Sequence, residues 1–363
     1  MDLFKFNIQF FADAGTLVNA TGNYVNAYDG TTTSFSGKNT LTAEMKEFYD
    51  TELLENARDK LIFAQLGRKQ GLPANHGRTI EFRRWRTLGR ISALTEGVIP
   101  TGKKLGQVAI TATLAQYGDY VTISDIIDLH AIDDVVLGAT EELGAAAGKT
   151  NDLLVRNVLL AGTNIIFADA YSGTTYQTTP STESGLQSAL GSSYTCNLTP
   201  RVINKAVTAL KKSAGDITYS GGYYVAVIHP DVAEDLRNDA AWLEAHKYAQ
   251  PDEIFNGEIG RMHGVRFIES NNAPVIKTDG QTYATFKTMF FAKDAFAVID
   301  AEGGGLQTII KSKEEIGGPL EQFSTVGCKF EMAAKILYQE RMVTVWSGSS
   351  YSSTETQNIT EAA

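Results

Sequence analysis

The longest helical pattern in the chain covers residues 133–162. Asp133 and Asp134 favour a helix N-terminus, and Gly162 favours a left-handed turn at the end. Close packing is the expected reason for three internal glycines, Gly138, Gly144 and Gly148, because each disfavours a helix. The pattern predicts one long helix with a core-facing stripe at steps of three and four: Val136, Thr140, Leu143, Ala147, Thr150, Leu154, Val158 and Ala161.

Residues 144–150 of this helix resemble a phosphate-binding loop. The sequence Gly-Ala-Ala-Ala-Gly-Lys-Thr has three residues between its glycines, whereas that motif needs four. The motif must also follow a strand, and no strand pattern precedes this segment. The segment is therefore predicted to be a packing face in the middle of the helix.

The first residues alternate between apolar and polar. Phe4, Phe6, Ile8 and Phe10 share one face of a period of two, which predicts a strand-like arm. Because one face is apolar, we expect the arm to dock on its own lobe or on a neighbouring subunit. Residues 12–40 are rich in Gly, Thr, Asn and Ser and predict a linker. A helical pattern begins at Thr42.

Residues 67–119 have the pattern of a long hairpin with an irregular tip. Two strand-like runs, Thr79–Leu88 and Gln107–Tyr117, flank a segment rich in glycine. A hairpin of this length encloses too little apolar area to be stable alone. It is either a solvated basic hairpin or an arm that lies on an acidic neighbour, and the charge contrast within the chain favours the second. The basic residues are Arg78, Arg83, Arg84, Arg86, Arg90, Lys103 and Lys104.

Helices and strands alternate from residue 199 onward, which predicts a second, α/β lobe. Thr199 and Pro200 mark a helix start, and Pro230 and Asp231 mark another. The predicted strands are Tyr223–His229, Gly264–Ser270, Met289–Ile299 and a pair formed by Gly327–Tyr338 and Arg341–Trp346. A tail rich in Ser and Thr follows.

Composition excludes several classes of protein. A chain of 363 residues favours two lobes. The sequence contains no run of 18 apolar residues, so it predicts no membrane-spanning helix. The net charge of −10 argues against a dedicated DNA-binding protein, although it suits a protein that lies near a polyanion without adhering to it.

No motif predicts a catalytic, cofactor-binding or metal site. The five histidines and two cysteines have no ligand spacing, and neither a nucleophile elbow nor a dinucleotide fingerprint is present. His229 lies near Asp231, but Pro230 between them favours a helix-capping turn over a catalytic pair.

Several separated segments, in order, resemble the major capsid proteins of tailed bacteriophages. The resemblance covers most of the chain, from about Thr42 to Trp346, and the N-terminal segment 5–12 also resembles the opening of such chains. The segments that carry it are residues 41–49, 77–83, 116–122, 257–260 and 264–267.

The resemblance implies an α+β fold of four parts. It places an N-terminal arm at residues 1–40, an extended loop at 67–119 and an axial domain at 200–310. The peripheral domain would take residues 41–66, 120–199 and 311–346, with its spine helix at 133–162. Residues 347–363 would form a flexible tail.

The implied function is structural and not enzymatic. The chain would assemble in the host bacterial cytoplasm, as hexamers and pentamers, into the icosahedral head shell of a virion. Scaffolding, portal and decoration proteins are implied partners, with non-specific proximity to packaged double-stranded DNA and no membrane. The candidate inter-subunit contacts are Phe4, Phe6, Ile8, Phe10, Arg83, Arg84, Arg86, Arg90, Lys103 and Lys104.

Two alternatives remain at this point. A cellular nanocompartment shell has the same fold but encloses enzymes in place of a genome. A soluble α/β enzyme would need a convergent polar pocket, which the sequence does not show.

Overall fold

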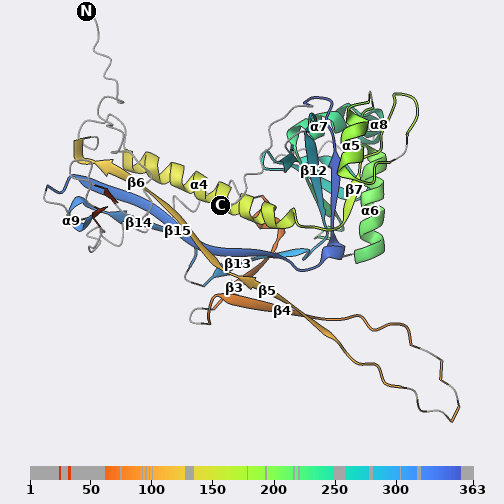
Figure 1. Ribbon diagram of the computed structural model, residues 1–363, viewed down its shortest axis with the longest axis horizontal. Helices are drawn as coiled ribbons and strands as arrows, with labels where there is room; N and C mark the ends of the chain where they lie inside the picture. The colour runs from red at the N-terminus through yellow and green to blue at the C-terminus, as the bar shows by residue number, and fades with distance from the viewer. Residues whose placement is uncertain are drawn as a thin grey trace, which may run out of the picture.

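The structure, a computed structural model, has an elongated lobe, an α/β lobe at one end and a projecting hairpin (Figure 1). It describes two short paired strands, β1 (Tyr24–Val25) and β2 (Thr32–Thr33), inside the predicted linker. Otherwise it describes residues 62–352, except for 74–75, 92, 95, 98, 100, 127–134, 178, 193, 216, 220, 248–257, 278–280, 303 and 317–319. The predicted arm strand and the helix starting at Thr42 lie outside the described residues.

The α/β lobe is built on a seven-stranded mixed sheet, which we call the axial sheet. Its strands lie in the order β7–β16–β12–β8–β10–β9, with β11 beside β12. Strand β8 is buried along its whole length, which confirms the predicted apolar strand near residues 223–229. The strands are β7 (Ile165–Phe167), β8 (Tyr224–Ile228), β9 (Glu258–Met262), β10 (Val265–Glu269), β11 (Val275–Ile276), β12 (Thr285–Phe291) and β16 (Met342–Ser347).

Four helices surround the axial sheet (Figure 1). Helix α5 (Glu183–Leu190) lies between the long helix and Thr199, where the sequence analysis predicts no element. Helix α6 (Pro200–Ala214) starts with the predicted N1 proline, although the Thr199 side chain makes no capping hydrogen bond. Helices α7 (Pro230–Asn238) and α8 (Ala240–Lys247) follow β8.

The elongated lobe is built on a five-stranded sheet, which we call the peripheral sheet. Its strand order is β14–β15–β13–β3, and β6 pairs with the other side of β15 in an antiparallel ladder. Helices α2 (Phe63–Leu66) and α9 (Lys313–Ile316) are short. The strands are β3 (Arg68–Leu72), β6 (Ala115–Ser124), β13 (Phe296–Ala301), β14 (Gln307–Lys311) and β15 (Phe323–Ile336).

The predicted long helix is confirmed as α4 (Val135–Leu159), which lies along β15 and β6 (Figure 1). The stripe is correct in its first half, where Thr140, Leu143 and Ala147 are buried. It is wrong in the second half, where Thr150, Leu154 and Val158 are only partly buried and the polar residues Asp152 and Arg156 are buried instead. These two polar residues face the core because they bond to other elements, so apolar periodicity could not identify them. No described helix is long and apolar enough to cross a membrane.

Two of the four glycines of this region, Gly138 and Gly162, differ from the roles expected for them. Gly162 is not left-handed; a Cβ atom there would collide with Cε of Met342, so glycine allows close approach to β16. Gly138 is exposed, and a Cβ atom there would have no neighbour within 4 Å, so packing does not explain it. Gly144 and Gly148 are buried, as predicted, and residues 144–150 lie in mid-helix.

The two lobes share one apolar core beneath α4. Val155 and Leu159 of α4 belong to the same cluster as Phe291 of the axial sheet and Phe296 of the peripheral sheet. The spine therefore joins the two sheets into one body, and its C-terminal half is packed against both.

The chain crosses between the sheets at two places that sequence reasoning missed. The predicted strand pair near residues 327–346 is wrong, because β15 lies in the peripheral sheet and β16 in the axial sheet, with the 3₁₀ turn η3 (Gln339–Arg341) between them. The predicted strand Met289–Ile299 is two strands, β12 and β13, separated by a turn in which Asp294 has φ of 58°. Buried strands of both sheets have the same apolar pattern, so the pattern does not show to which sheet a strand belongs.

Candidate functional site: the extended hairpin and its base

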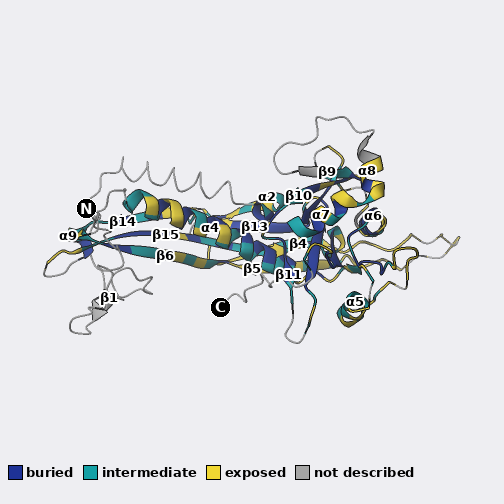
Figure 2. Cartoon of the chain, turned by 90° about the horizontal axis from the view of Figure 1, so that it is seen from above, coloured by how far each residue is buried: buried dark blue, intermediate teal, exposed yellow. Residues whose placement is uncertain are grey.

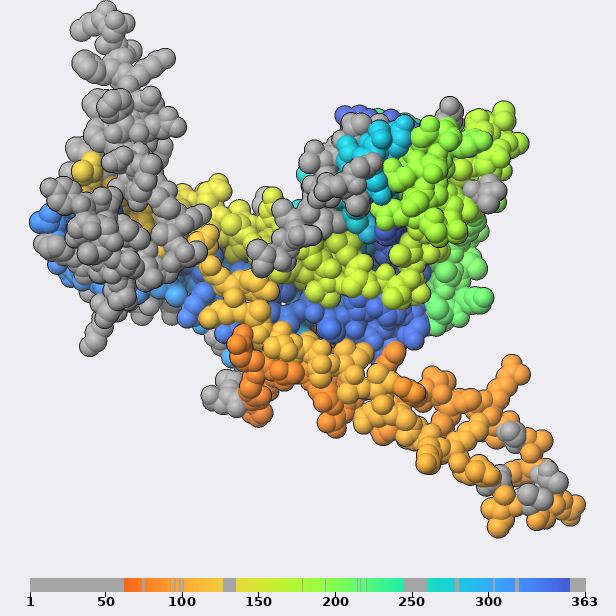
Figure 3. Space-filling view, viewed as in Figure 1, coloured from red at the N-terminus to blue at the C-terminus, as the bar shows by residue number. Residues whose placement is uncertain are grey.

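The predicted hairpin is present and projects from the body (Figures 1 and 3). Strands β4 (Thr79–Trp85) and β5 (Gln107–Thr113) pair antiparallel, with Thr79 opposite Thr113 and Trp85 opposite Gln107. Both strands are shorter than predicted. After Leu114 the chain enters β6 and pairs with β15, so Tyr117 belongs to the peripheral sheet.

An apolar cluster anchors the base of the hairpin. Ile80 and Phe82 share one face of β4, since side chains two apart point the same way. They pack against a cluster from β3, β5, β13 and the residues that directly follow β5 and β15: Leu72, Ala112, Leu114, Ala297, Ile299 and Leu337. The base of the hairpin is therefore part of the folded body.

Beyond the base, the hairpin exposes large apolar side chains. Ile91 and Ile99 are 94% and 92% exposed, and much of the hairpin is coloured as exposed in Figure 2. Large exposed apolar side chains gathered in one projecting segment are typical of an interface. The full set is Trp85, Leu88, Ile91, Leu94, Ile99 and Leu105. In the hairpin, the contacts predicted from the sequence include only basic residues. The signal for Ile91, Leu94 and Ile99 was that they are apolar in a segment with neither helical nor strand period.

The predicted basic residues do not all face the same way. Arg83 pairs with Glu81 on its own strand at 2.6 Å, and Lys103 donates to the carbonyl groups of Gly89 and Arg90. Arg84 instead points to the body and pairs with Glu340 of η3 at 3.2 Å. The side chains of Arg86, Arg90 and Lys104 are exposed. Phe4, Phe6, Ile8 and Phe10 lie outside the described residues.

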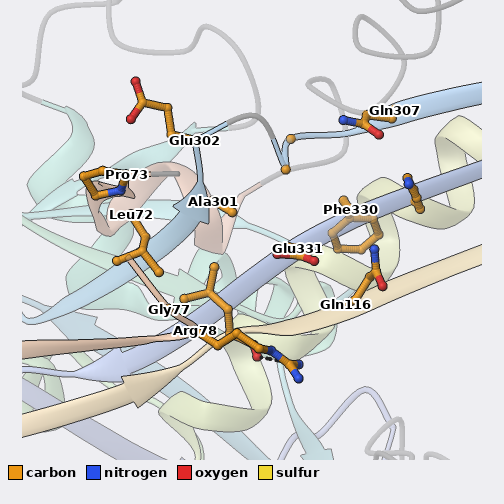
Figure 4. A pocket seen from close by; sticks show the side chains of 14 residues that line it. Leu72, Pro73, Gly77, Arg78, Gln116, Ala301, Glu302, Gln307, Phe330 and Glu331 are labelled. Carbon is orange, nitrogen blue, oxygen red and sulfur yellow. Dashed lines mark hydrogen bonds between the residues drawn. The ribbon is translucent and has the colours of Figure 1, made fainter. Parts of the chain in front are cut away.

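An open pocket of about 280 Å³ lies beside the base of the hairpin (Figure 4). Its apolar lining includes Leu72, Leu114 and Phe330, and charged residues of both signs border it. Arg78 is held there by a hydrogen bond from Nη2 to the carbonyl of Leu114, 3.1 Å long. Among the residues that the structure describes, the lining contains no histidine, cysteine, serine or threonine.

A second hollow, of about 360 Å³, lies in the axial lobe and is lined by Asp169, Asp235 and Asp239 among others. Asp169 is already neutralised: Nζ of Lys205 lies 2.6 Å from its carboxylate and Nε of Arg201 lies 3.3 Å away. Burial raises the pKa of Asp169, but bonds from Lys205 and Thr179 and the nearby cations outweigh it, so the pKa lies below its ordinary value. No cluster of metal-ligand residues occurs among the described residues.

The other reactive side chains have structural roles. Nδ1 of His229 accepts a hydrogen bond of 3.3 Å from the backbone N–H of Asp231 at the start of α7, which confirms the predicted capping turn. Burial, with the charge of Asp169, raises the pKa of the Cys196 thiol to about 11. Cys328 is also buried, and this burial raises the pKa of its thiol. Both thiols are therefore unreactive at neutral pH.

Comparison with known proteins gives a family. A family model described as "Phage capsid protein" matches residues 107–322, more than half of the chain. No curated protein sequence matches the chain.

Several solved structures that resemble this chain are phage capsids. The capsid of Ralstonia phage GP4 is 17% identical, with a TM-score of 0.58 over 78% of this chain and 87% of that chain. The capsid of cyanophage Pam1 is 15% identical, with a TM-score of 0.57 over 92% of this chain and 100% of that chain. The capsid of cyanophage P-SCSP1u is 14% identical, with a TM-score of 0.57 over 80% and 89%. At these identities the likeness shows the fold.

Proposed function

Because this chain belongs to the phage capsid protein family, we propose that it is the major capsid protein of a tailed phage and assembles into the icosahedral shell of the head. The exposed apolar surface of the hairpin carries this proposal. A monomer leaves residues such as Ile91 and Ile99 in water, whereas repeated contact with a second copy buries them.

The mode of assembly follows from the position of the hairpin. Its base is anchored in the body by Ile80 and Phe82, while its distal part projects away from both lobes (Figure 3). We propose that this part lies on the neighbouring subunit of a hexamer or pentamer, with Arg83, Arg86, Arg90, Lys103 and Lys104 contributing charge complementarity. The N-terminal arm, through Phe4, Phe6, Ile8 and Phe10, is the second proposed contact.

The finer biological statements are part of the same proposal. Shells would form in the cytoplasm of the bacterial host and enclose double-stranded DNA, with scaffolding, portal and decoration proteins as partners. The chain would act as a structural protein and not as an enzyme. The family match favours a phage head over a nanocompartment.

Sedimentation of the purified full-length chain tests the proposal. We expect capsomer rings or shells of megadalton mass as the protein concentration rises. A hairpin variant with Trp85→Ser, Ile91→Ser and Ile99→Ser should remain a folded monomer at the same concentrations. If the unaltered chain sediments as a compact monomer throughout, the proposed function is wrong.

A further inference from the structure

We infer that Arg84, Tyr338, Glu340 and Arg341 form a clamp that fixes the direction in which the hairpin leaves the body, and that this direction controls assembly. The inference rests on the proposed function as a shell subunit. It assigns positioning residues to that function, and it gives Arg84 a different role from the basic residues that face outward.

Arg84 lies one residue before the end of β4 and contacts the body. Side chains two apart share a face, so Arg84 follows Ile80 and Phe82 on the anchored face. Its Nη1 lies 3.2 Å from Oε2 of Glu340, and its guanidinium carbon lies 5.1 Å from the centre of the Tyr338 ring. The Arg84 side chain is 31% exposed, whereas that of its neighbour Arg83 is 64% exposed.

The surface that receives Arg84 is itself held in place. The backbone N–H of Tyr338 donates to the carbonyl of Ala295 at 3.0 Å. The guanidinium of Arg341 lies 3.9 Å from the Tyr338 ring centre, and Nη1 of Arg341 donates to the carbonyl of Lys293 at 3.2 Å. The backbone hydrogen bond to Ala295 and the Arg341 guanidinium hold the Tyr338 ring in place. The ring therefore offers a preorganised cation–π site for Arg84.

The segment beyond the clamp depends on the base for its direction. The hydrogen bonds described for residues 86–106 stay within the hairpin, for example from the Arg86 N–H to the Gly106 carbonyl at 2.8 Å. At about 3.3 Å per residue, ten extended residues span roughly 33 Å, so a small rotation at the base moves the distal part by a large distance. Residues 339–341 also connect β15 of one sheet to β16 of the other, so the clamp ties the hairpin to the join between the lobes.

The direction of the hairpin is measured on the unassembled full-length chain by pulsed electron paramagnetic resonance. Spin labels are attached to Thr101→Cys in the hairpin and Thr208→Cys on α6, both at exposed positions. Native Cys196 and Cys328 are buried and remain unlabelled. We expect a narrow distance distribution that broadens in Arg84→Gln and in Tyr338→Leu. The matched control Arg83→Gln removes an adjacent cation that bonds only within β4, and should leave the distribution unchanged.

The effect on assembly is measured by light scattering against protein concentration. Arg84→Gln should raise the concentration needed for assembly at least about threefold, because the hairpin of every copy is then less well preoriented for its neighbour. The double variant that exchanges the charges, Arg84→Glu with Glu340→Arg, should assemble at a lower concentration than the single variant Arg84→Glu. An unchanged distance distribution in Arg84→Gln, or an assembly concentration equal to that of the unaltered chain, overturns the inference. Failure of the unaltered chain to assemble contradicts the proposed function instead, and the label distances still decide whether the clamp exists.

Discussion

The carboxylate of Asp152 in α4 accepts a hydrogen bond of 2.7 Å from the backbone N–H of Phe63, 89 residues earlier in the chain. The same carboxylate accepts from Nδ2 of Asn272 at 2.9 Å. Arg156, one turn further along α4, donates through Nη1 to the carbonyl of Asn272 at 3.2 Å. Asp152 and Arg156 are fully buried, so they hold α4, the start of α2 and a loop of the axial lobe together.

Removing Asp152 should therefore destabilise the subunit. Asp152→Ala leaves the Arg156 charge and two backbone N–H groups without this partner, and we expect a loss of about 3–5 kcal/mol in the free energy of unfolding. Glu141→Ala, at an exposed site on the same helix, is the control and should stay within about 0.5 kcal/mol. Urea unfolding of the unassembled chain, followed by circular dichroism, measures both. Equal stabilities for the two variants would show that the cluster is dispensable.

Asp169 predicts a pH dependence. Its pKa is below the ordinary value, so the unfolded chain binds a proton more readily, and the stabilisation is present above about pH 4 and lost as the pH falls further. Lys205→Met removes one bonded cation, and since Lys205 is partly exposed we expect a cost of about 1 kcal/mol at pH 7. Thermal melts at neutral and acid pH should show that this difference shrinks below about pH 4. The same difference at both pH values would contradict the assignment.

The exposed apolar residues of the hairpin should matter for assembly and not for folding. Ile91→Ser with Ile99→Ser alters side chains that are more than nine-tenths exposed, so the subunit should melt within about 2 °C of the unaltered chain. Assembly, followed by light scattering, should be strongly weakened because the apolar contact is lost in every copy. Thr101→Ser in the same hairpin is the control. Normal assembly of the double variant would exclude these two residues from the interface.

The outward-facing basic residues are expected to add a smaller, salt-dependent contribution. Arg83→Glu with Arg86→Glu should leave subunit melting within about 2 °C, because exposed substitutions usually cost less than about 0.5 kcal/mol. The double variant should need a higher concentration to assemble. Raised salt should weaken assembly of the unaltered chain, since charges are screened beyond about 8 Å at physiological ionic strength. Assembly that responds to neither change would mean that these cations are only solvated.

The N-terminal arm is predicted to act after folding. Deleting residues 1–40 should leave cooperative thermal unfolding intact, because the described cores consist of residues from Ile62 onward. The truncated chain should assemble poorly, as judged by sedimentation beside the full-length chain. Loss of cooperative unfolding would place the arm in the core.

The sequence was sufficient where one element has one strong period. The presence of α4 and of the two hairpin strands follows from such periods, although the strands are shorter than predicted. The position of Gly144 in the middle of α4 follows in the same way. It was insufficient where packing decides. Asp152 and Arg156 are buried because partners distant in sequence satisfy them, and the assignment of β15 and β16 to different sheets depends on the turn at η3. Arg83 and Arg84 are adjacent residues of the same type. Their roles differ because successive side chains of β4 point to opposite faces, so that Arg84 faces the body and Arg83 faces solvent.

Electron microscopy of the full-length chain after size fractionation tests the central claim most directly. We expect closed shells of uniform diameter, or capsomer rings, in the fraction of highest mass, and their loss when Ile91 and Ile99 are both replaced by serine. Compact monomers at every concentration, with the hairpin folded as described, would contradict it.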